Sequence, residues 1–523
     1  MKKLKYITKG ILGAIAVSLA MVSCSEDIMD QINEDVNHSK DVQAKFILSD
    51  VITSTAFSNT GGDFNTYSSV YVEHEVGTHN QLYRAEHRES EPSAASTFNN
   101  VWGSTYAALK NARIIIAKTS EGGTEAGNRV TRGMAEVLAA YNSALIADMF
   151  GDAPWSEAAI VDKNGNPGNM TPKLDTQSEI YAGVMKYLDD AIADLQSGTS
   201  NTGGYDLLYG GNRANWLKLA YGLKARYTMR LIARSTNRNA DLQNVISFAD
   251  QSFASAAEQA AFAIYDASNL NPLFDYQWSR DGLAASKSMS EKLIERHDPR
   301  LRRVFVDPDW VQMEGADDEN FFMAPNGANQ EIQYFYNTSI FTYSQIAPTL
   351  LLSYHEVKFL KAEALARLNR IAEAKTVLKQ AVIAGIANTE VNVAAAMDAP
   401  TILGYGGLEE TTSAITPAEA SAYFDTYVSP LFDANPLKET MVQKYISFFG
   451  ASGESTEAYS DVRRMKALNE NFVELKNPNN ATQFPLRAPY GSDDTTTNPA
   501  VQSAYGDGQY VYSVPVWWAG GNR

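Results

Sequence analysis

The sequence predicts a mostly α-helical protein, in which tetratricopeptide-like helical hairpins form a scaffold for a large irregular, loop-rich region. In several long segments, apolar residues recur every three or four positions, which places them on one face of a helix. These segments follow one another in pairs, and pairing indicates a helical repeat. The stretches between them are rich in Gly, Asn, Asp, Pro and aromatic residues and show no sustained period.

The apolar period predicts seven helices, and residues at the ends support two of them. Thr176 or Asp175, followed by Glu179, resembles the capping box that starts a helix. Gly151 follows Phe150 at the end of another helix, where glycine commonly terminates the helical conformation. The predicted helices span residues 97–118, 128–149, 176–196, 213–235, 240–253, 353–368 and 371–386.

The helix pair within residues 355–384 gives the best case for a repeat. Ala362 precedes Leu365 by three positions and Ala374 precedes Leu378 by four, which is the spacing of a tetratricopeptide unit. The small residues let two helices approach closely, and the large residues fill the gap between them. Any other antiparallel helical hairpin is the alternative interpretation.

The stretches without a helical period form the predicted irregular region. Loops this long are usually functional or disordered, and their aromatic content favours an ordered region packed into the same body. They are residues 197–212, 266–285, 305–349, 387–416 and 476–523. We therefore predict a signal peptide at 1–23, a tether at 24–45 and a single body at 46–523, loop-rich at about 266–349 and 387–523.

The first 24 residues have the layout of a bacterial lipoprotein signal. Four lysines precede an apolar run from Ile11 to Val22, which is too short to span a bilayer as a helix. Ser23 is a small residue at the cleavage site, and Cys24 follows it directly. We predict that Cys24 is acylated and anchors the protein in a membrane, with ordinary secretion as the alternative. No other segment is long and apolar enough to predict a membrane span.

Charge and cysteine content exclude several classes of protein. The 523 residues carry 61 acidic and 44 basic side chains, for a net charge of −17. This balance argues against a nucleic-acid-binding protein, which needs a basic face. The single cysteine excludes an intrachain disulfide and any multi-cysteine metal site. Removal of the signal, which has four lysines and no acids, lowers the net charge to −21.

Motifs for catalysis and metal binding are weak. The sequence has no phosphate-binding loop and no GxGxxG or GxSxG motif. His74 and His79 resemble a zinc-protease motif, but on a helix their spacing of five separates them by about 140°. Residues 162–173 begin like a calcium loop, yet Pro167 and Lys173 replace the glycine and glutamate that it needs. We predict no catalytic residue, metal or cofactor, although a carboxylate pair for glycoside hydrolysis stays open.

Several short stretches occur in order along most of the chain, after Cys24 and the acidic residues that follow it. They are 32–37 (INEDVN), 148–157 (DMFGDAPWSE), 216–231 (WLKLAYGLKARYTMRL), 297–301 (HDPRL), 353–364 (SYHEVKFLKAEA), 443–445 (QKY) and 461–464 (DVRR). Together these stretches resemble the SusD/RagB family, the nutrient-binding surface lipoproteins of Bacteroidetes. Cys24 and its acidic neighbours resemble the lipid anchor and export signal of that family.

The resemblance implies a right-handed tetratricopeptide-like scaffold that binds a nutrient, usually a glycan, without making or breaking a bond. It also implies a protein partner, a TonB-dependent SusC-like barrel of the outer membrane, over which the lipid-anchored protein sits as a lid on the cell surface. Within the motifs, Trp216, Arg226, Glu356 and Glu363 are expected to serve packing and buried ion pairs.

Ligand-binding residues vary among members of the family, so our candidates rest on composition. Flat aromatic rings suit the faces of sugar rings, whose C–H groups stack on them while hydroxyls bond to polar neighbours. The stacking candidates are Trp278, then Trp310, Tyr334 and Tyr336, with Asp275 and Arg280 as hydrogen-bonding neighbours. For each ring the alternative is a place in the core beneath the loops. A peptide ligand, a surface glycoside hydrolase and a peptide-binding repeat protein are the alternative functions.

Overall fold

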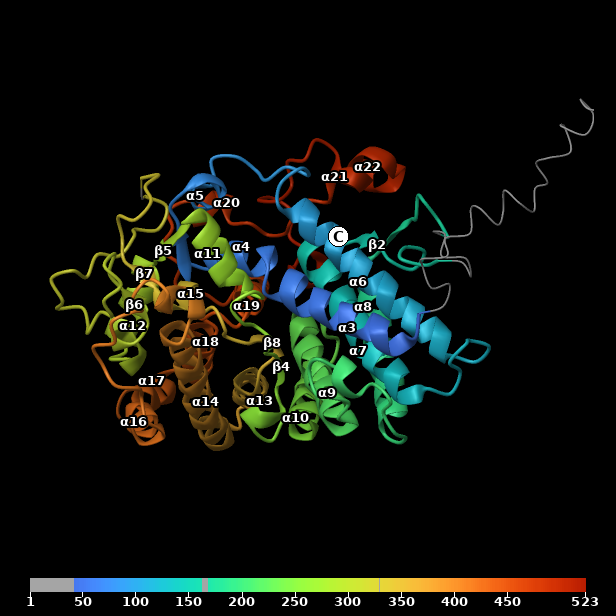
Figure 1. Ribbon diagram of the computed structural model, residues 1–523, viewed down its shortest axis with the longest axis horizontal. Coiled ribbons are helices and arrows are strands. Elements are labelled where there is room, and N and C mark those ends of the chain that lie inside the picture. The colour runs from blue at the N-terminus through green and yellow to red at the C-terminus, as the bar shows by residue number, and fades with distance from the viewer. Residues whose placement is uncertain (1–41, 162–167, 329) are drawn as a thin grey trace, which may run out of the picture. The chain divides into compact units, whose positions relative to one another are not determined.

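The predicted helical periods are present as helices in the computed structural model, which describes residues 42–161, 168–328 and 330–523 (Figure 1). Thr176 starts its helix with the predicted capping box, because its side chain accepts from the Glu179 N–H while the Glu179 carboxylate accepts from the Thr176 N–H. Gly151 ends the preceding helix at a φ of +80°, which a glycine adopts without a Cβ clash. These helices are α6 (Phe98–Thr119), α7 (Arg129–Phe150), α8 (Gln177–Leu195), α9 (Arg213–Arg230), α10 (Arg238–Gln251), α13 (Tyr354–Arg367) and α14 (Ile371–Met397).

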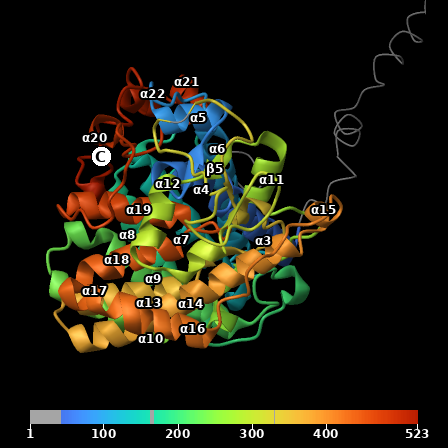
Figure 2. The same cartoon turned by 90° about the vertical axis from the view of Figure 1, so that its left-hand side faces the viewer.

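Each of these helices packs against the next one in the sequence, which confirms the tetratricopeptide-like scaffold. At the contact between α13 and α14, Ala362, Leu365, Ala374 and Leu378 are all buried, as the repeat spacing predicts. The end view shows α9, α10, α13 and α14 side by side (Figure 2). The apolar residues of the scaffold belong to one continuous core that also includes the helices near both ends of the described chain.

The predicted end of α14 at residue 386 is wrong, since the helix continues to Met397. Its last three turns bury Thr389, Asn392 and Val393, so the buried stripe there is partly polar and shows no apolar period. The Asn392 side chain accepts from the Ala451 N–H at 2.9 Å and donates to the Asn388 carbonyl at 2.7 Å. Tertiary hydrogen bonds therefore stabilise a helical end that hydrophobicity alone does not reveal.

The predicted loop-rich stretch 387–523 also holds several helices. These are α15 (Pro400–Leu403), α16 (Pro417–Tyr423), α17 (Ser429–Ala434), α18 (Pro436–Ser447), α19 (Ser455–Ala467), α20 (Asn480–Gln483), α21 (Ser492–Thr497) and α22 (Pro499–Tyr505), with a π-helical turn at Phe424–Val428 and a 3₁₀ turn at Trp517–Ala519. Helix α18 packs on α13 and α14, and α19 packs on α4 (Asp63–Tyr71). Part of this stretch is therefore scaffold and not loop.

The segment before α6 is helical too, although the sequence did not predict these helices. They are α3 (Ala44–Thr53), a π-helical turn (Ser54–Thr60), α4 (Asp63–Tyr71) and α5 (Asn80–His87). Helix α3 begins inside the predicted tether 24–45 and includes its last two residues. Cys24 and the rest of the signal and tether lie outside the described residues.

Short helices and strands form the remaining irregular part, and they are α11 (Pro272–Arg280), α12 (Lys287–Glu295) and 3₁₀ turns at 203–205, 231–234, 256–258, 299–302 and 340–343. Four antiparallel strand pairs join distant segments: β1 (Glu75–Gly77) with β5 (Leu283–Ala285), β2 (Ala153–Pro154) with β3 (Leu174–Asp175), β4 (Ala260–Phe262) with β8 (Thr349–Leu352), and β6 (Phe305–Val306) with β7 (Thr338–Ser339). In the first pair Glu75 lies opposite Ala285. No helix within the described residues has the length and apolar content needed to cross a membrane.

Residues of the family-like motifs lie in the core, as expected. Trp216 is fully buried, and its indole N–H donates to Asp206 at 2.8 Å. Arg226 on α9 donates to Glu356 on α13 at 2.7 Å, and both side chains are buried. These contacts fix α9 against α13 across a gap of 130 residues in the sequence.

Candidate functional site

Helix α11 organises the candidate site, although it lies in a stretch predicted to be a loop. Asn271 caps the helix by accepting from the Leu273 N–H at 2.9 Å, and Pro272 occupies the first turn, where its missing N–H costs nothing. The Asn271 amide also donates to the carbonyls of Ala347 and Ala451 at 2.9 and 3.1 Å. One side chain thus starts the helix and fixes it on the scaffold, and the views place α11 between α4 and α15 (Figures 1 and 2).

Two exposed aromatic rings lie together at α11, one from the helix itself and one from the chain that follows α15. Trp278 is 39% exposed, and it stacks on the buried ring of Phe274 at 5.8 Å with 9° between the ring planes. Tyr405, which follows α15 and is 72% exposed, lies 5.5 Å from Trp278. Phe274 belongs to a small hydrophobic cluster with Ala399 and Ile402, so the exposed rings rest on packed side chains. We call Trp278, Tyr405 and Phe274 the α11 ring group.

Trp310 supports this group from below. It packs against the Phe274 cluster and lies 5.8 Å from the ring of Tyr343. Its φ of +68° is unusual for a bulky residue, and such strain is characteristic of functional sites. Its carbonyl accepts from the Glu409 N–H at 3.0 Å, which joins the loop around Trp310 to the connection that carries Tyr405.

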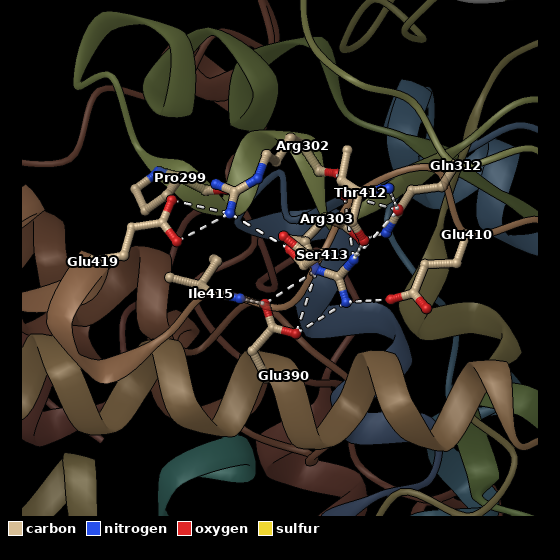
Figure 3. Close-up of polar contacts among 10 residues, drawn as sticks. All are labelled: Pro299, Arg302, Arg303, Gln312, Glu390, Glu410, Thr412, Ser413, Ile415 and Glu419. Carbon is tan, nitrogen blue, oxygen red and sulfur yellow. Dashed lines mark hydrogen bonds and ion pairs between the residues drawn. The ribbon is translucent and has the colours of Figure 1, made fainter.

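An arginine fixes the base of that connection (Figure 3). The buried Arg303 guanidinium donates to Glu390 on α14 at 3.1 Å, to Glu410 at 2.8 Å and to the Thr412 carbonyl. The neighbouring Arg302 pairs with Glu419 on α16 at 2.9 Å. The chain from α14 to α16 is therefore held at its base, while the tip around Tyr405 is exposed.

The other two predicted rings lie near the C-terminal end of α11. Tyr334 is 74% exposed, and its hydroxyl donates to the carboxylate of Asp281, the residue that ends α11. Tyr336 is only 9% exposed and stacks on Phe322 at 5.2 Å with 24° between the ring planes. Tyr334 thus offers an exposed ring face, whereas the nearly buried Tyr336 packs against the exposed rings of Phe322 and Phe335.

A second face of α11, formed by residues other than Trp278, lines an open surface pocket of about 350 Å³, which we call the α11 pocket. Asp275 and Arg280 line it from α11, Asp63 from the start of α4 and Asn100 from α6. Burial raises the pKa of Asp63 to about 6, against the opposing effects of a hydrogen bond from Asn100 and the charge of Arg280. The remaining lining residues are Phe57, Ser58, Gly62, Thr66, Val101, Ser104, Pro272, Tyr276 and Ser279.

The structure therefore gathers most of the sequence candidates around one helix. Trp278 carries one of the exposed rings, while Asp275 and Arg280, which are also exposed, line the pocket beside it. Tyr405 was not predicted, although a tyrosine flanked by Gly404, Gly406 and Gly407 could have indicated an exposed ring. Asp63 and Asn100 carried no sequence signal, because their approach to α11 is a product of the fold.

The two histidines of the zinc-like motif lie in different environments. His74 is fully buried, with its ring nitrogens 2.9 Å from the Ser455 hydroxyl and 3.0 Å from the Tyr445 carbonyl, and burial lowers its pKa to about 3. His79 precedes α5 and lies 3.8 Å from Glu331. Residues 162–167 of the calcium-like loop lie outside the described residues. Within the described chain, no three His, Cys, Asp or Glu side chains gather closely enough to hold a metal ion.

Comparison with protein families decides the relationship of the chain. A family described as starch-binding and associating with the outer membrane matches residues 36–491. The chain belongs to the SusD-like family. This SusD-like protein is therefore a member of a family of starch- and nutrient-binding proteins associated with the outer membrane. A comparison with curated proteins gives no match.

Solved structures agree with this assignment. A SusD/RagB family protein from Bacteroides thetaiotaomicron is 55% identical over 92% of this chain and 100% of its own, with a TM-score of 0.87. A chitin-binding protein is 22% identical over 91% of this chain and 100% of its own, with a TM-score of 0.70. A SusD homolog from Bacteroides fragilis is 18% identical over 92% and 100%, with a TM-score of 0.68. The last two show the same fold alone.

Proposed function

We propose that this SusD-like protein captures a glycan on the α11 ring group and the α11 pocket and passes it to a TonB-dependent SusC-like barrel. In this proposal Cys24 carries the lipid that anchors the protein on the outer face of the outer membrane. The protein binds and releases its ligand without chemistry on it. A peptide or another nutrient is the alternative ligand.

One observation carries the proposal, namely that a supported pair of exposed rings and a pocket with polar lining residues adjoin the same short helix, on which Trp278 and Asp275 lie one turn apart and are both exposed. Trp278 and Tyr405 offer apolar surface for the C–H face of a sugar. Asn100, Asp275 and Arg280 offer donors and acceptors for hydroxyl groups in the pocket. Apolar walls with a few placed polar groups are typical of small-ligand sites.

A surface glycoside hydrolase is the second candidate, and one observation favours it. Asp63 and Asp275 line the same pocket, and the raised pKa of Asp63 suits a general acid. Release of reducing ends from a polysaccharide by the purified protein would support hydrolysis. Binding without release supports the lead proposal.

Calorimetric binding to a panel of plant, host and microbial glycans tests the proposal. The panel includes starch, because of the family description, and chitin oligomers, because a structure with this fold is a chitin-binding protein. Trp278→Ala, alone or combined with Trp310→Ala, is expected to weaken binding of a confirmed ligand about fivefold or more, since a lost stacking ring costs about 1 kcal/mol. Trp310→Ala alone is expected to weaken binding because it removes the ring that packs against the Phe274 cluster. Tyr427→Ala is the matched control, because Tyr427 is 41% exposed but lies in the turn between α16 and α17.

Normal binding by all three tryptophan variants would show that the site assignment is wrong. The anchor and the partner need separate measurements. Cys24→Ser is expected to move the protein out of the membrane fraction, and the lipidated protein is expected to co-purify with a barrel. A Cys24→Ser protein that stays in the membrane would refute the anchor but leave the ligand site standing.

A further inference from the structure

We propose that the α11 pocket selects glycans that carry no carboxylate or sulfate group, so that neutral or amine-bearing sugars are its ligands. This inference rests on the proposed function and names the class of ligand for the same site. The charges inside the pocket carry it. They belong to three side chains, Asp63 on α4 and Asp275 and Arg280 on α11.

Two carboxylates and one guanidinium give the pocket an excess of negative charge. Within the described chain, neither aspartate forms an ion pair within 4 Å, and Arg280 forms none, so no close contact neutralises these groups. The charge of Arg280 nevertheless acts on Asp63 through space. A sugar acid bound here would meet two like charges and one opposite charge, of which only Asp63 is partly buried and thereby shielded from screening by salt, while Asp275 and Arg280 are exposed.

The groups around Asp63 set the pKa of its carboxyl group, and therefore the pH range in which the pocket has an excess of negative charge. Asn100 on α6 hydrogen-bonds to its carboxyl group, and Arg280 faces it from α11. Tyr67 on α4 and Tyr276 on α11 are neutral phenols there, because burial raises the pKa of both hydroxyl groups. The charge of Arg84 on α5 opposes the effect of burial and by itself lowers the pKa of Tyr67.

Since burial raises the pKa of Asp63 to about 6, the carboxyl group is ionised at pH 7.5 and protonated at pH 5. The three charges then sum to −1 at pH 7.5 and to zero at pH 5. Discrimination against anionic sugars is therefore strongest at neutral and alkaline pH. It weakens as the pH falls through 6.

Paired probes at 0.15 M salt test the selectivity. The probes are soluble starch, xylan and chitin oligomers, each compared with its carboxymethylated form, whose carboxylates stay ionised at pH 5. For a neutral probe that binds, we expect the carboxymethylated form to bind at least tenfold more weakly at pH 7.5. We expect the difference to fall to threefold or less at pH 5.

Single-charge variants separate the pocket from the charge of the whole protein. Asp63→Asn is expected to reduce the discrimination at pH 7.5 and to abolish its dependence on pH, and Asp275→Asn to reduce it at both pH values. Glu121→Gln is the matched control, because Glu121 is exposed beyond the far end of α6, about 30 Å along that helix from Asn100. This control changes the net charge equally and is expected to keep the full discrimination.

Each outcome decides a different claim. Equal binding of neutral and carboxymethylated probes at pH 7.5 overturns the selectivity and leaves the proposed function intact. An equal effect of Glu121→Gln and Asp275→Asn also overturns it, since the net charge of the protein would then be the cause. If no neutral glycan binds at all, the proposed function fails and the selectivity fails with it.

Discussion

A side chain that stacks on a sugar must expose one part of its ring and keep the rest fixed. Trp278 meets this condition, because Phe274 lies parallel to it at 5.8 Å and is itself fully buried. Without such support, an exposed tryptophan loses rotamer freedom when it binds, and part of the stacking energy is lost as entropy. The packed Phe274 therefore adds to affinity without touching the ligand.

Tyr405 is the ring whose contribution is easiest to isolate. It is 72% exposed, so Tyr405→Ala is expected to leave the melting temperature of the protein unchanged. The same variant is expected to lower the affinity for a confirmed glycan about fivefold. In a double-mutant cycle with Trp278→Ala, the two losses should not add if both rings contact the same sugar. Tyr205→Ala is the control, because Tyr205 is 43% exposed and packs on Phe46, away from α11. Additive losses would place the two rings on different parts of the ligand.

The composition of the sequence predicted that aromatic residues form the binding site, but it did not predict which of these rings are exposed. The sequence pointed to aromatic residues between 266 and 349, and Trp278 and Tyr334 are indeed exposed there. Tyr336, two positions from Tyr334, is nearly buried, and no local pattern distinguishes the two. Exposure depends on which loop covers which ring, and that is decided by contacts between distant segments.

Among the elements, the connection from α14 to α16 combines a fixed base with an exposed tip. Arg303 fixes the base of this connection through its hydrogen bond to Glu390 on α14. Further along the connection, the Glu409 N–H donates to the Trp310 carbonyl. Its tip contains Gly406 and Gly407, whose φ values of +118° and +86° suit glycine alone. The position of Tyr405 over Trp278 thus depends on an arginine that does not reach the ligand surface.

Replacement of Arg303 tests whether the position of Tyr405 depends on it. Arg303→Met keeps the buried stem but leaves Glu390 and Glu410 without their shared cation, which is expected to cost about 1–3 kcal/mol of unfolding free energy. Amide exchange across residues 404–412 should become faster, and glycan affinity should fall as in Tyr405→Ala. Arg302→Met is the control, because Arg302 is 25% exposed against 2% for Arg303 and its partner Glu419 lies on α16. Unchanged exchange in residues 404–412 would show that Arg303 does not hold the connection.

Helices were predictable where their buried face is apolar, as in α7 and α8, and not where it is polar. Helix α19 buries Asp461, Arg463 and Arg464, so its hydrophobic pattern is weak although the helix is central. Helix α11 was missed for a different reason. It is only nine residues long, and Asn271 fixes it through backbone carbonyls far along the chain.

At the scale of the whole body, buried ion pairs connect the N-terminal and C-terminal parts of the scaffold. Arg230 on α9 lies 3.0 Å from Asp148 on α7 and also pairs with Glu457 on α19. Glu363 on α13 receives Arg464 of α19 at 2.8 Å. The family-like stretches of the sequence predicted a structural role for Glu363, but not its partner. That pairing exists only when helices that are distant in the sequence have packed.

Glu363 is the best residue with which to test this network. Burial alone would raise its pKa, but Arg464 and Arg367 together lower it to about 2. A carboxyl group whose pKa is lower in the folded state than its unfolded value of about 4.5 stabilises the fold above pH 4.5, and this contribution is lost as the pH falls toward 2. Glu363→Gln is therefore expected to cost about 3–5 kcal/mol of unfolding free energy at pH 7, and progressively less between pH 4.5 and pH 2.

Urea unfolding at several pH values measures this difference. Asp433→Asn is the control, because its ion pair with Lys375 is largely exposed and is expected to contribute less than about 1 kcal/mol. If Glu363→Gln is as stable as the parent protein at pH 7, the arginines find other partners and the network does not join the scaffold. A loss that stays constant down to pH 2 would show that the shape of the side chain matters there and its charge does not.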